Sequence, residues 1–335
     1  MLTSLFIGMV SVQLIVLVLI LHGIGSLSDN GPLVIDYYKE SCPHLEQIVQ
    51  RNVEIAVLRE PRMAASLLRL HFHDCFVLGC DASVLLDNSE SIVSEKQAGP
   101  NKNSLRGFDV IDEIKHTLEE ACPLTVSCAD ILALAARDAV VLRGGHRWDV
   151  HFGRRDSIKA SLEGANKFLP APNSSLEILV ANFQQHGLDT QDLVALSGSH
   201  TIGKSRCFTF RQGIYHDEEQ FHLKRDTTYQ EILRSLCPES GNDDELAPLD
   251  SATPARFDNL YYHNIIQGQG LLISDNVLVS EDVGGDIRKL VWNFANDQDF
   301  FFHSFGNSMI KMGSINVLTG EEGEIRRNCR FVNTK

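Results

Sequence analysis

The most informative part of the chain is the segment Ser66-Leu-Leu-Arg-Leu-His-Phe-His-Asp-Cys-Phe-Val-Leu-Gly-Cys-Asp-Ala-Ser83. On a helix, Arg69, Phe72 and His73 stand at i, i+3 and i+4, so a cation, an aromatic ring and a titratable imidazole share one face. An imidazole that accepts and returns a proton beside a fixed guanidinium suits cleavage of a small, polar O–O bond. Taken alone, the same pattern also fits an ordinary surface or capping pair.

Oxygen-bearing side chains follow this helix in a short loop bounded by two cysteines. Asp74, Asp81 and Ser83 supply hard oxygen atoms, and Gly79 gives the loop freedom to bend. Calcium takes six to eight oxygen ligands, including backbone carbonyls. The spacing is not that of an EF-hand, and acidic loop residues that simply face solvent are the alternative.

A third group of interest is Leu196-Ser-Gly-Ser-His-Thr-Ile-Gly203, in which His200 follows small residues. Small neighbours let a bulky planar group approach an imidazole, so His200 is a candidate iron ligand, with a purely structural histidine as the alternative. The sequence contains no Cys-x-x-Cys-His, which excludes covalent c-type haem attachment.

The composition limits the classes of function. The 335 residues carry a net charge of -14, with 43% hydrophobic and 22% charged residues, so the chain can bury a sizeable core and is not disordered. Binding to nucleic acid requires a basic face, and no dense Lys/Arg cluster occurs. A small molecule is therefore the expected partner.

The N-terminal segment predicts export. Residues 1–28 contain no Asp, Glu, Lys or Arg, and 5–21 form an almost unbroken apolar run. We interpret 1–28 as a signal peptide, with an uncleaved signal anchor as the alternative because a basic flank is missing. No later stretch is apolar enough to span a bilayer, so we expect no membrane association after signal removal.

The eight cysteines follow this segment, and an even number in an exported chain favours disulfides. Spacing suggests a short loop between Cys75 and Cys80 and a longer one between Cys207 and Cys237. It leaves the other pairings open, since eight cysteines allow 105 arrangements. A zinc site has no matching spacing.

Capping signals predict a chain of mostly helices. Ser127 and Asp130 form a capping box before the apolar run 131–142, and Ser174 with Glu177 opens a second run. Strand-like alternation is scarce, and no internal repeat is present.

Proline and polar residues mark the breaks between helices. Pro61 separates the helical runs 48–58 and 63–76, because proline is tolerated only in a first helical turn. The polar stretch 237–245 reads as a loop. We therefore expect one mostly α-helical domain over residues 29–335.

Together these segments resemble the secreted plant haem peroxidases of class III, and the resemblance covers Leu33 to Asn333. The motifs that carry it, beyond the three segments above, are Tyr38-Lys-Glu-Ser-Cys-Pro43, Glu95-Lys96, Gly99-Pro-Asn101, Val126-Ser-Cys-Ala-Asp130, Gly153-Arg-Arg-Asp-Ser157, Leu169-Pro-Ala-Pro172, 253–262, Leu318-Thr-Gly320 and Asn328-Cys329. Each is weak alone, but their order and spacing are specific. The resemblance implies the haem peroxidase fold, in which helices enclose one non-covalent haem b between a distal and a proximal side.

The resemblance also implies roles for the distal residues. His73 is expected to be the acid–base residue, Arg69 its charge-stabilising partner and Phe72 a wall that keeps bulky donors from the iron. Asn101 is expected to hydrogen-bond the other nitrogen of His73 and fix its tautomer, with Glu95 in support.

On the proximal side, the resemblance makes His200 the axial iron ligand and Asp275 the carboxylate that accepts its remaining N–H. Pro170 is expected to line the entrance for reducing substrates. The sequon at Asn173 lies beside that entrance and is a possible N-glycosylation site.

Two calcium ions and four disulfides are implied in the same way. The expected distal calcium ligands are Asp74, Val77, Gly79, Asp81 and Ser83. The expected proximal ligands are Thr201, Asp250, Thr253, Arg256 through its carbonyl, and Asp258. The expected disulfides are Cys42–Cys122, Cys75–Cys80, Cys128–Cys329 and Cys207–Cys237.

A few residues depart from the usual family pattern. Leu78 stands where asparagine is common, and Ser199 stands where alanine or glycine is usual. His146, Arg147 and His151 replace a more proline-rich segment. None of these changes removes an expected catalytic group.

The sequence therefore predicts a secreted, monomeric haem peroxidase that reduces hydrogen peroxide and oxidises phenolic donors in two one-electron steps, as in lignification, wall cross-linking or stress responses. We expect it outside the cell or in the cell wall rather than in the vacuole. The alternative is a non-catalytic, calcium-stapled secreted binding protein, against which the presence of Arg69, His73, Asn101 and His200 argues.

Overall fold

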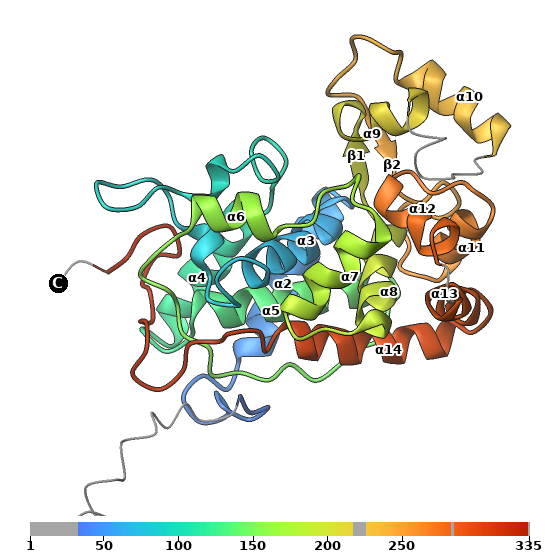
Figure 1. The fold of residues 1–335 in the computed structure, drawn as a ribbon. Coiled ribbons are helices and arrows are strands. Elements are labelled where there is room, and N and C mark those ends of the chain that lie inside the picture. Colours follow the sequence, from blue (N-terminus) through green and yellow to red (C-terminus); the bar gives the residue numbers. More distant parts are fainter. Residues whose placement is uncertain (1–32, 217–225, 283–284, 334–335) are drawn as a thin grey trace, which may run out of the picture.

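The computed structural model describes residues 33–216, 226–282 and 285–333, so the predicted signal peptide over 1–28 lies outside the described residues. Helices dominate this part of the chain (Figure 1), which confirms the predicted mostly α fold. The α-helices are α2 Leu45–Arg59, α3 Met63–Cys75, α4 Phe108–Ala121, α5 Cys128–Leu142, α6 Leu162–Phe168, α7 Leu176–Gln185, α8 Thr190–Ser197, α9 Cys207–Tyr215, α10 Thr227–Leu236, α11 Leu260–Ile266, α12 Ile273–Ser280, α13 Asp286–Asn296 and α14 Gln298–Met312. The 3₁₀ turns are η1 Ser83–Leu85, η2 Glu95–Gln97 and η3 Gly198–Thr201.

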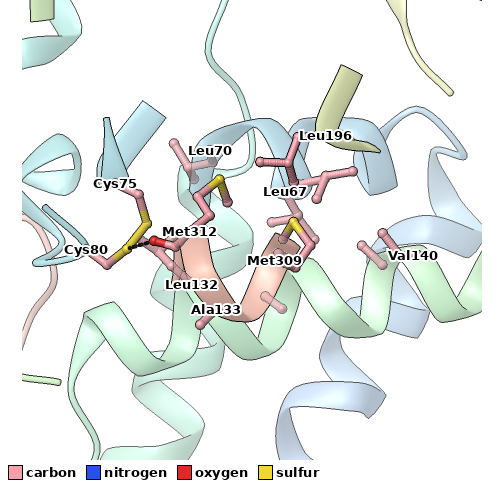
Figure 2. Close-up of a cluster of buried hydrophobic side chains, with 14 of the residues drawn as sticks. Leu67, Leu70, Cys75, Cys80, Leu132, Ala133, Val140, Leu196, Met309 and Met312 are labelled. Atoms are coloured by element: carbon pink, nitrogen blue, oxygen red, sulfur yellow. Dashed lines mark hydrogen bonds between the residues drawn. A yellow bond between two sulfur atoms is a disulfide. The ribbon is translucent and has the colours of Figure 1, made fainter. Parts of the chain in front are cut away.

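Helix α5 is the centre of the main core. Every residue from Cys128 to Val140 is buried, as expected for a helix that is apolar on nearly all sides. The Ser127 hydroxyl caps it by accepting a 3.1 Å hydrogen bond from the Asp130 N–H, which confirms the predicted helix start. Helix α3 packs along α5, and Met309 of α14 contacts the same apolar cluster (Figure 2). The helix that carries the candidate distal residues therefore rests on the most buried element.

The helix boundaries follow the sequence signals with one correction. Helix α2 ends at Arg59 and α3 begins at Met63, so Pro61 separates them as predicted. Helix α7, however, is capped by Ser175 and not by Ser174. The Ser174 N–H donates to the Ala171 carbonyl at 3.0 Å, which holds Ser174 in the preceding turn and delays the helix by one residue.

A small lobe of α9, α10 and two short strands stands beside the main helical body (Figure 1). Strands β1 Lys204–Arg206 and β2 Leu246–Pro248 pair antiparallel, with Ser205 opposite Ala247. The lobe has its own apolar cluster. The predicted loop over 237–245 connects α10 to β2.

None of the helices in the described ranges has the length and apolar character needed to cross a membrane.

Candidate active site

Helix α3 presents the predicted face of three residues. His73 is buried, whereas Arg69 and Phe72 keep part of their surface accessible. The rings of Phe72 and His73 lie 5.4 Å apart, edge to face. The helix therefore places a cation, an aromatic wall and an imidazole together, as the periodicity predicts.

A chain of hydrogen bonds orients His73. Its Nδ1 lies 2.6 Å from Asn101 Oδ1, and Asn101 Nδ2 donates to the backbone carbonyl of Glu95 at 2.9 Å. Because the second bond assigns the amide nitrogen, Oδ1 must accept from His73, so Nδ1 carries the hydrogen. Nε2 is then left with a free lone pair, which is the form that a general base needs.

Electrostatics favour the neutral form of this imidazole. Burial and the nearby charge of Arg69 lower the pKa of His73 well below its usual value, although the Asn101 bond opposes them. The carboxyl group of Glu95 takes no part in the bond to Asn101: its Oε1 accepts from the Ser161 N–H at 2.9 Å. Burial raises the pKa of Glu95 to about 7.

The guanidinium of Arg69 is held by residues that follow Asn101. It donates from Nη2 to the Pro100 carbonyl at 2.9 Å and from both Nη atoms to Ser104 Oγ at 3.2 Å. Burial lowers the pKa of Arg69 to about 10, so the group stays charged at neutral pH. Ser104 was not among the residues expected from the sequence, and nothing in its local pattern distinguishes it.

His200 lies in η3 and is oriented by Asp275 from α12. Its Nδ1 is 2.9 Å from Asp275 Oδ1, which also accepts a 3.0 Å hydrogen bond from the Tyr261 hydroxyl. Burial acts to lower the pKa of His200, but the charge and hydrogen bond of Asp275 outweigh it, and the net pKa is raised. Tyr261 is a second contributor that the sequence did not reveal, because it comes from a third element, α11.

Protein packing alone requires a glycine at position 198. A Cβ there would lie 2.4 Å from the Tyr262 hydroxyl and 2.5 Å from the Phe301 ring. The glycine therefore lets η3 pack closely against α11 and α14. Ser199 is partly exposed.

The donor set around His200 fits an axial haem ligand. The side chain keeps 36% of its surface accessible. The charge of Arg69 acts to lower the pKa of His200, so the guanidinium lies on the same side of the protein interior. With Nδ1 committed to Asp275, Nε2 is the nitrogen that remains for iron.

The loop after α3 fits a calcium ion. Asp74 and Asp81 are both buried, and burial together with the charge of Asp81 raises the pKa of Asp74. The buried Ser83 hydroxyl lies beside them without a well-formed hydrogen bond. Gly79 has φ +122°, and a Cβ there would lie 2.5 Å from the Asn316 carbonyl oxygen. Burial and mutual repulsion make the ionised form of both carboxyl groups unfavourable. A bound cation would offset that cost.

A second group of oxygens converges next to His200. Thr201 Oγ1 lies 3.1 Å from Asp250 Oδ2 and 3.4 Å from Asp258 Oδ1. Thr253 Oγ1 lies 3.0 Å from the same Asp258 oxygen, and the Arg256 carbonyl is 3.5 Å from Thr201 Oγ1. Both carboxylates are buried, with Asp250 at 0% and Asp258 at 4% exposure. All five expected proximal ligands therefore lie together.

The four expected disulfides are present: Cys42–Cys122, Cys75–Cys80, Cys128–Cys329 and Cys207–Cys237. Among the described residues, His71, Cys75 and Cys80 bring three potential metal-ligand atoms within 4.8 Å of one another. Both sulfurs belong to the second disulfide, so this group is not a metal site.

The expected substrate entrance lies between α6 and α7. Pro170 is partly exposed and Asn173 is exposed. The Pro172 carbonyl accepts a 2.9 Å hydrogen bond from the Ser274 N–H, next to Asp275. The segment that carries Pro170 is thus tied to the helix that orients His200.

Comparison with known proteins agrees with this arrangement. The family model described as Peroxidase matches residues 49–297. Peroxidase 20 of Arabidopsis thaliana is 64% identical over 313 residues, which cover 92% of this chain and 93% of that protein. Peroxidase 9 and Peroxidase 15 of the same plant are each 54% identical, over 92% and 91% of this chain and 89% and 90% of those proteins. The chain belongs to the peroxidase family.

Family membership and fold define the class of protein. The chain is a plant haem-type peroxidase with the haem peroxidase fold, and it is an enzyme that acts on hydrogen peroxide. A non-catalytic binding protein is therefore not favoured.

Proposed function

We propose that Arg69, His73 and His200 carry the reduction of hydrogen peroxide, with phenols as the electron donors in two one-electron steps. The observation that carries this proposal is the pair of oriented histidines. His73 is fixed through Nδ1 by Asn101, and His200 is fixed through Nδ1 by Asp275. Each imidazole thereby keeps its Nε2 free, one as a base and one as a ligand.

His73 would transfer the proton, and Arg69 would stabilise the negative charge. The neutral Nε2 of His73 takes the proton from one peroxide oxygen and returns it to the other, which leaves as water. The guanidinium of Arg69, held by Pro100 and Ser104, stabilises the negative charge that develops on the departing oxygen. Phe72 beside His73 restricts the space to small substrates.

We propose one non-covalent haem b, with His200 Nε2 as the axial ligand. When bound there, haem would supply the redox chemistry that links reduction of peroxide to one-electron oxidation of the donors. Asp275, supported by Tyr261, accepts the Nδ1 hydrogen of His200 and makes the imidazole a stronger electron donor.

We further propose two calcium ions, one at each oxygen cluster. The distal ion would be held by Asp74, Val77, Gly79, Asp81 and Ser83, and the proximal ion by Thr201, Asp250, Thr253, Arg256 and Asp258. Each cluster is joined to a functional histidine by one peptide bond, since Asp74 follows His73 and Thr201 follows His200. Each ion would therefore fix the backbone from which a key imidazole projects.

The remaining assignments concern the donor and the location. We propose that phenolic donors approach past Pro170, near a glycan site at Asn173. Residues 1–28 would direct export, after which 29–335 would act as a monomeric peroxidase domain in the cell wall or outside the cell.

Replacing His73 tests the central assignment. We expect His73→Ala to retain haem, visible as an unchanged Soret absorption, while peroxide reduction slows at least about 100-fold, because a general acid–base group typically contributes that much. Stopped-flow absorption measures the rate. His116→Ala, which removes an exposed imidazole on α4, is the matched control. A His73→Ala rate within about tenfold of the wild type would refute the assignment.

A further inference from the structure

Two histidines and a carboxylate meet on the surface, outside the sites described above. Asp299 and His303 stand one turn apart on α14, and His146 lies in the segment after α5. All three side chains are exposed, with His146 at 49% and Asp299 at 78%. His146 is one of the residues that depart from the usual pattern of the family.

His303 is oriented as a metal ligand is. Its Nδ1 lies 2.8 Å from the Asp299 backbone carbonyl. A carbonyl only accepts hydrogen bonds, so Nδ1 carries the hydrogen and Nε2 keeps a lone pair. Metal-bound histidines usually donate their other ring N–H to a carbonyl or carboxylate in this way.

The three side chains lie near one another, although their ligand atoms do not all fall within 4.8 Å of one another. The rings of His146 and His303 have centroids 5.9 Å apart, and His146 Nε2 lies 3.8 Å from Asp299 Oδ1. With metal–ligand bonds of about 2.0–2.1 Å, tetrahedral geometry places ligand atoms about 3.3 Å apart and ring centroids about 5 Å apart. Rotation of the exposed side chains closes the remaining distance, and water completes the coordination.

The surroundings favour a cation. The next residue in the sequence, Arg147, is positively charged, but it forms an ion pair with Glu46. The chain as a whole has a net charge of -14. The Phe302 ring lies 4.5 Å from the His146 ring.

We propose that His146, Asp299 and His303 bind a divalent transition-metal ion, such as Zn²⁺ or Cu²⁺, at a surface site distinct from the calcium and haem sites. Imidazole nitrogen selects these ions over Ca²⁺ and Mg²⁺, which prefer oxygen. Cu²⁺ binds more tightly than Zn²⁺, following the usual order of affinities. The ion links α14 to the segment that follows α5.

The proposal is tested by isothermal titration calorimetry, in which Zn²⁺ is added to the haem-loaded protein in a buffer that keeps the calcium sites filled. We expect one site whose affinity falls at least about tenfold in His146→Gln and in His303→Gln, because even the loss of a residue that only hydrogen-bonds a metal ligand costs about 10- to 100-fold in affinity. The matched control is His116→Gln. It removes an exposed imidazole 3.4 Å from Glu120 on one helix, a His–carboxylate pair without a second histidine.

The outcomes separate the proposal from adventitious binding. Binding that survives in the His146→Gln/His303→Gln double variant, or an affinity that falls equally in His116→Gln, overturns it. Absence of Zn²⁺ binding at millimolar concentration overturns it as well. Electron paramagnetic resonance of bound Cu²⁺ gives a second readout, because the proposal requires coupling to two imidazole nitrogens in the wild type and one in each single variant.

Discussion

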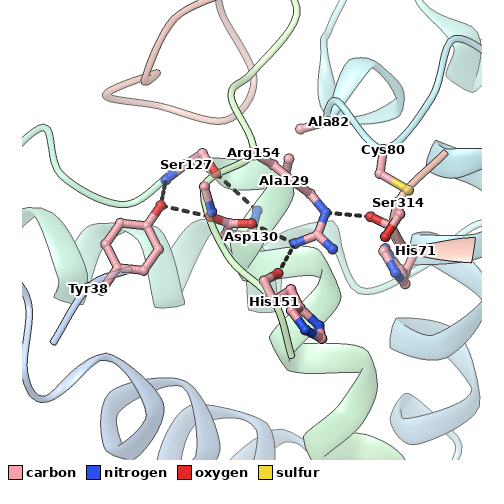
Figure 3. Close-up of polar contacts among 12 residues, drawn as sticks. Tyr38, His71, Cys80, Ala82, Ser127, Ala129, Asp130, His151, Arg154 and Ser314 are labelled. Carbon is pink, nitrogen blue, oxygen red and sulfur yellow. Dashed lines mark hydrogen bonds and ion pairs between the residues drawn. The ribbon is translucent and has the colours of Figure 1, made fainter. Parts of the chain in front are cut away.

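Acid is expected to destabilise the protein through His71, on the side of α3 turned away from His73. The side chain is 1% exposed, and its ring nitrogens lie 3.6 and 3.9 Å from Cys75 Sγ. Burial, together with the charge of the neighbouring Arg154, lowers the pKa of His71 to about 3 (Figure 3). Arg154 itself is fixed by a 2.7 Å ion pair with Asp130.

The size of the effect follows from linkage. An unfolded histidine has a pKa of about 6.5, so between about pH 6.5 and pH 3 the unfolded chain binds a proton that the folded protein excludes. The free energy of unfolding therefore falls as the pH falls, by about 1.4 kcal/mol per pH unit. At pH 5 the loss attributable to His71 is about 2 kcal/mol, or about 4 °C in melting temperature for a chain of this size.

His71→Gln removes the titrating group and keeps a polar side chain of similar size. Urea unfolding of the haem- and calcium-loaded protein at pH 7 and pH 5 measures the change. We expect the wild type to lose about 2 kcal/mol more than His71→Gln between these pH values. His116→Gln, which removes an exposed imidazole, should keep the wild-type pH dependence. Equal pH dependence in the wild type and His71→Gln would refute the reasoning.

Two further predictions concern the proximal side. Gly198→Ala should lower the free energy of unfolding by about 1–3 kcal/mol, the usual cost of overpacking, because the new methyl group would collide with Tyr262 and Phe301. Urea unfolding measures this change, and an unchanged value would show that η3 can shift freely. Asp250→Asn should reduce the calcium content found by elemental analysis from about two ions per chain to about one, because a buried carboxylate ligand is lost. Asp243→Asn, at an exposed carboxylate, is the control. An undiminished calcium content in Asp250→Asn would rule out the proximal site.

Local signals in the sequence predicted local structure well. The Pro61 break and the Ser127 cap act over a few residues, and both stand where they were expected. The cap of α7 was misplaced by one residue because Ser174 and Ser175 are chemically equivalent. The choice between them depends on the turn that binds the Ser174 N–H.

Contacts between distant segments could not be read from spacing. His200 and Asp275 are 75 residues apart, and Tyr261 joins them from a separate helix. The resemblance to a family supplied Asp275, but Tyr261 and Ser104 became visible only in the structure. The pairing of distant cysteines could not be predicted from spacing either, since Cys128 and Cys329 are 201 residues apart and no local pattern joins them.

The geometry of the distal site depends on both sides of α3. One side carries Arg69 and His73, which bind the segment from Pro100 to Ser104. The other side is attached through the Asp74 carboxylate, which accepts a 2.9 Å hydrogen bond from the Ala82 N–H, and through the disulfide at Cys75. Because a 1 Å displacement of a catalytic group can cost about 100-fold in rate, loosening the attachments on the second side would also impair the acid–base role that we propose for His73. The acidic loop and the disulfide therefore help to position His73.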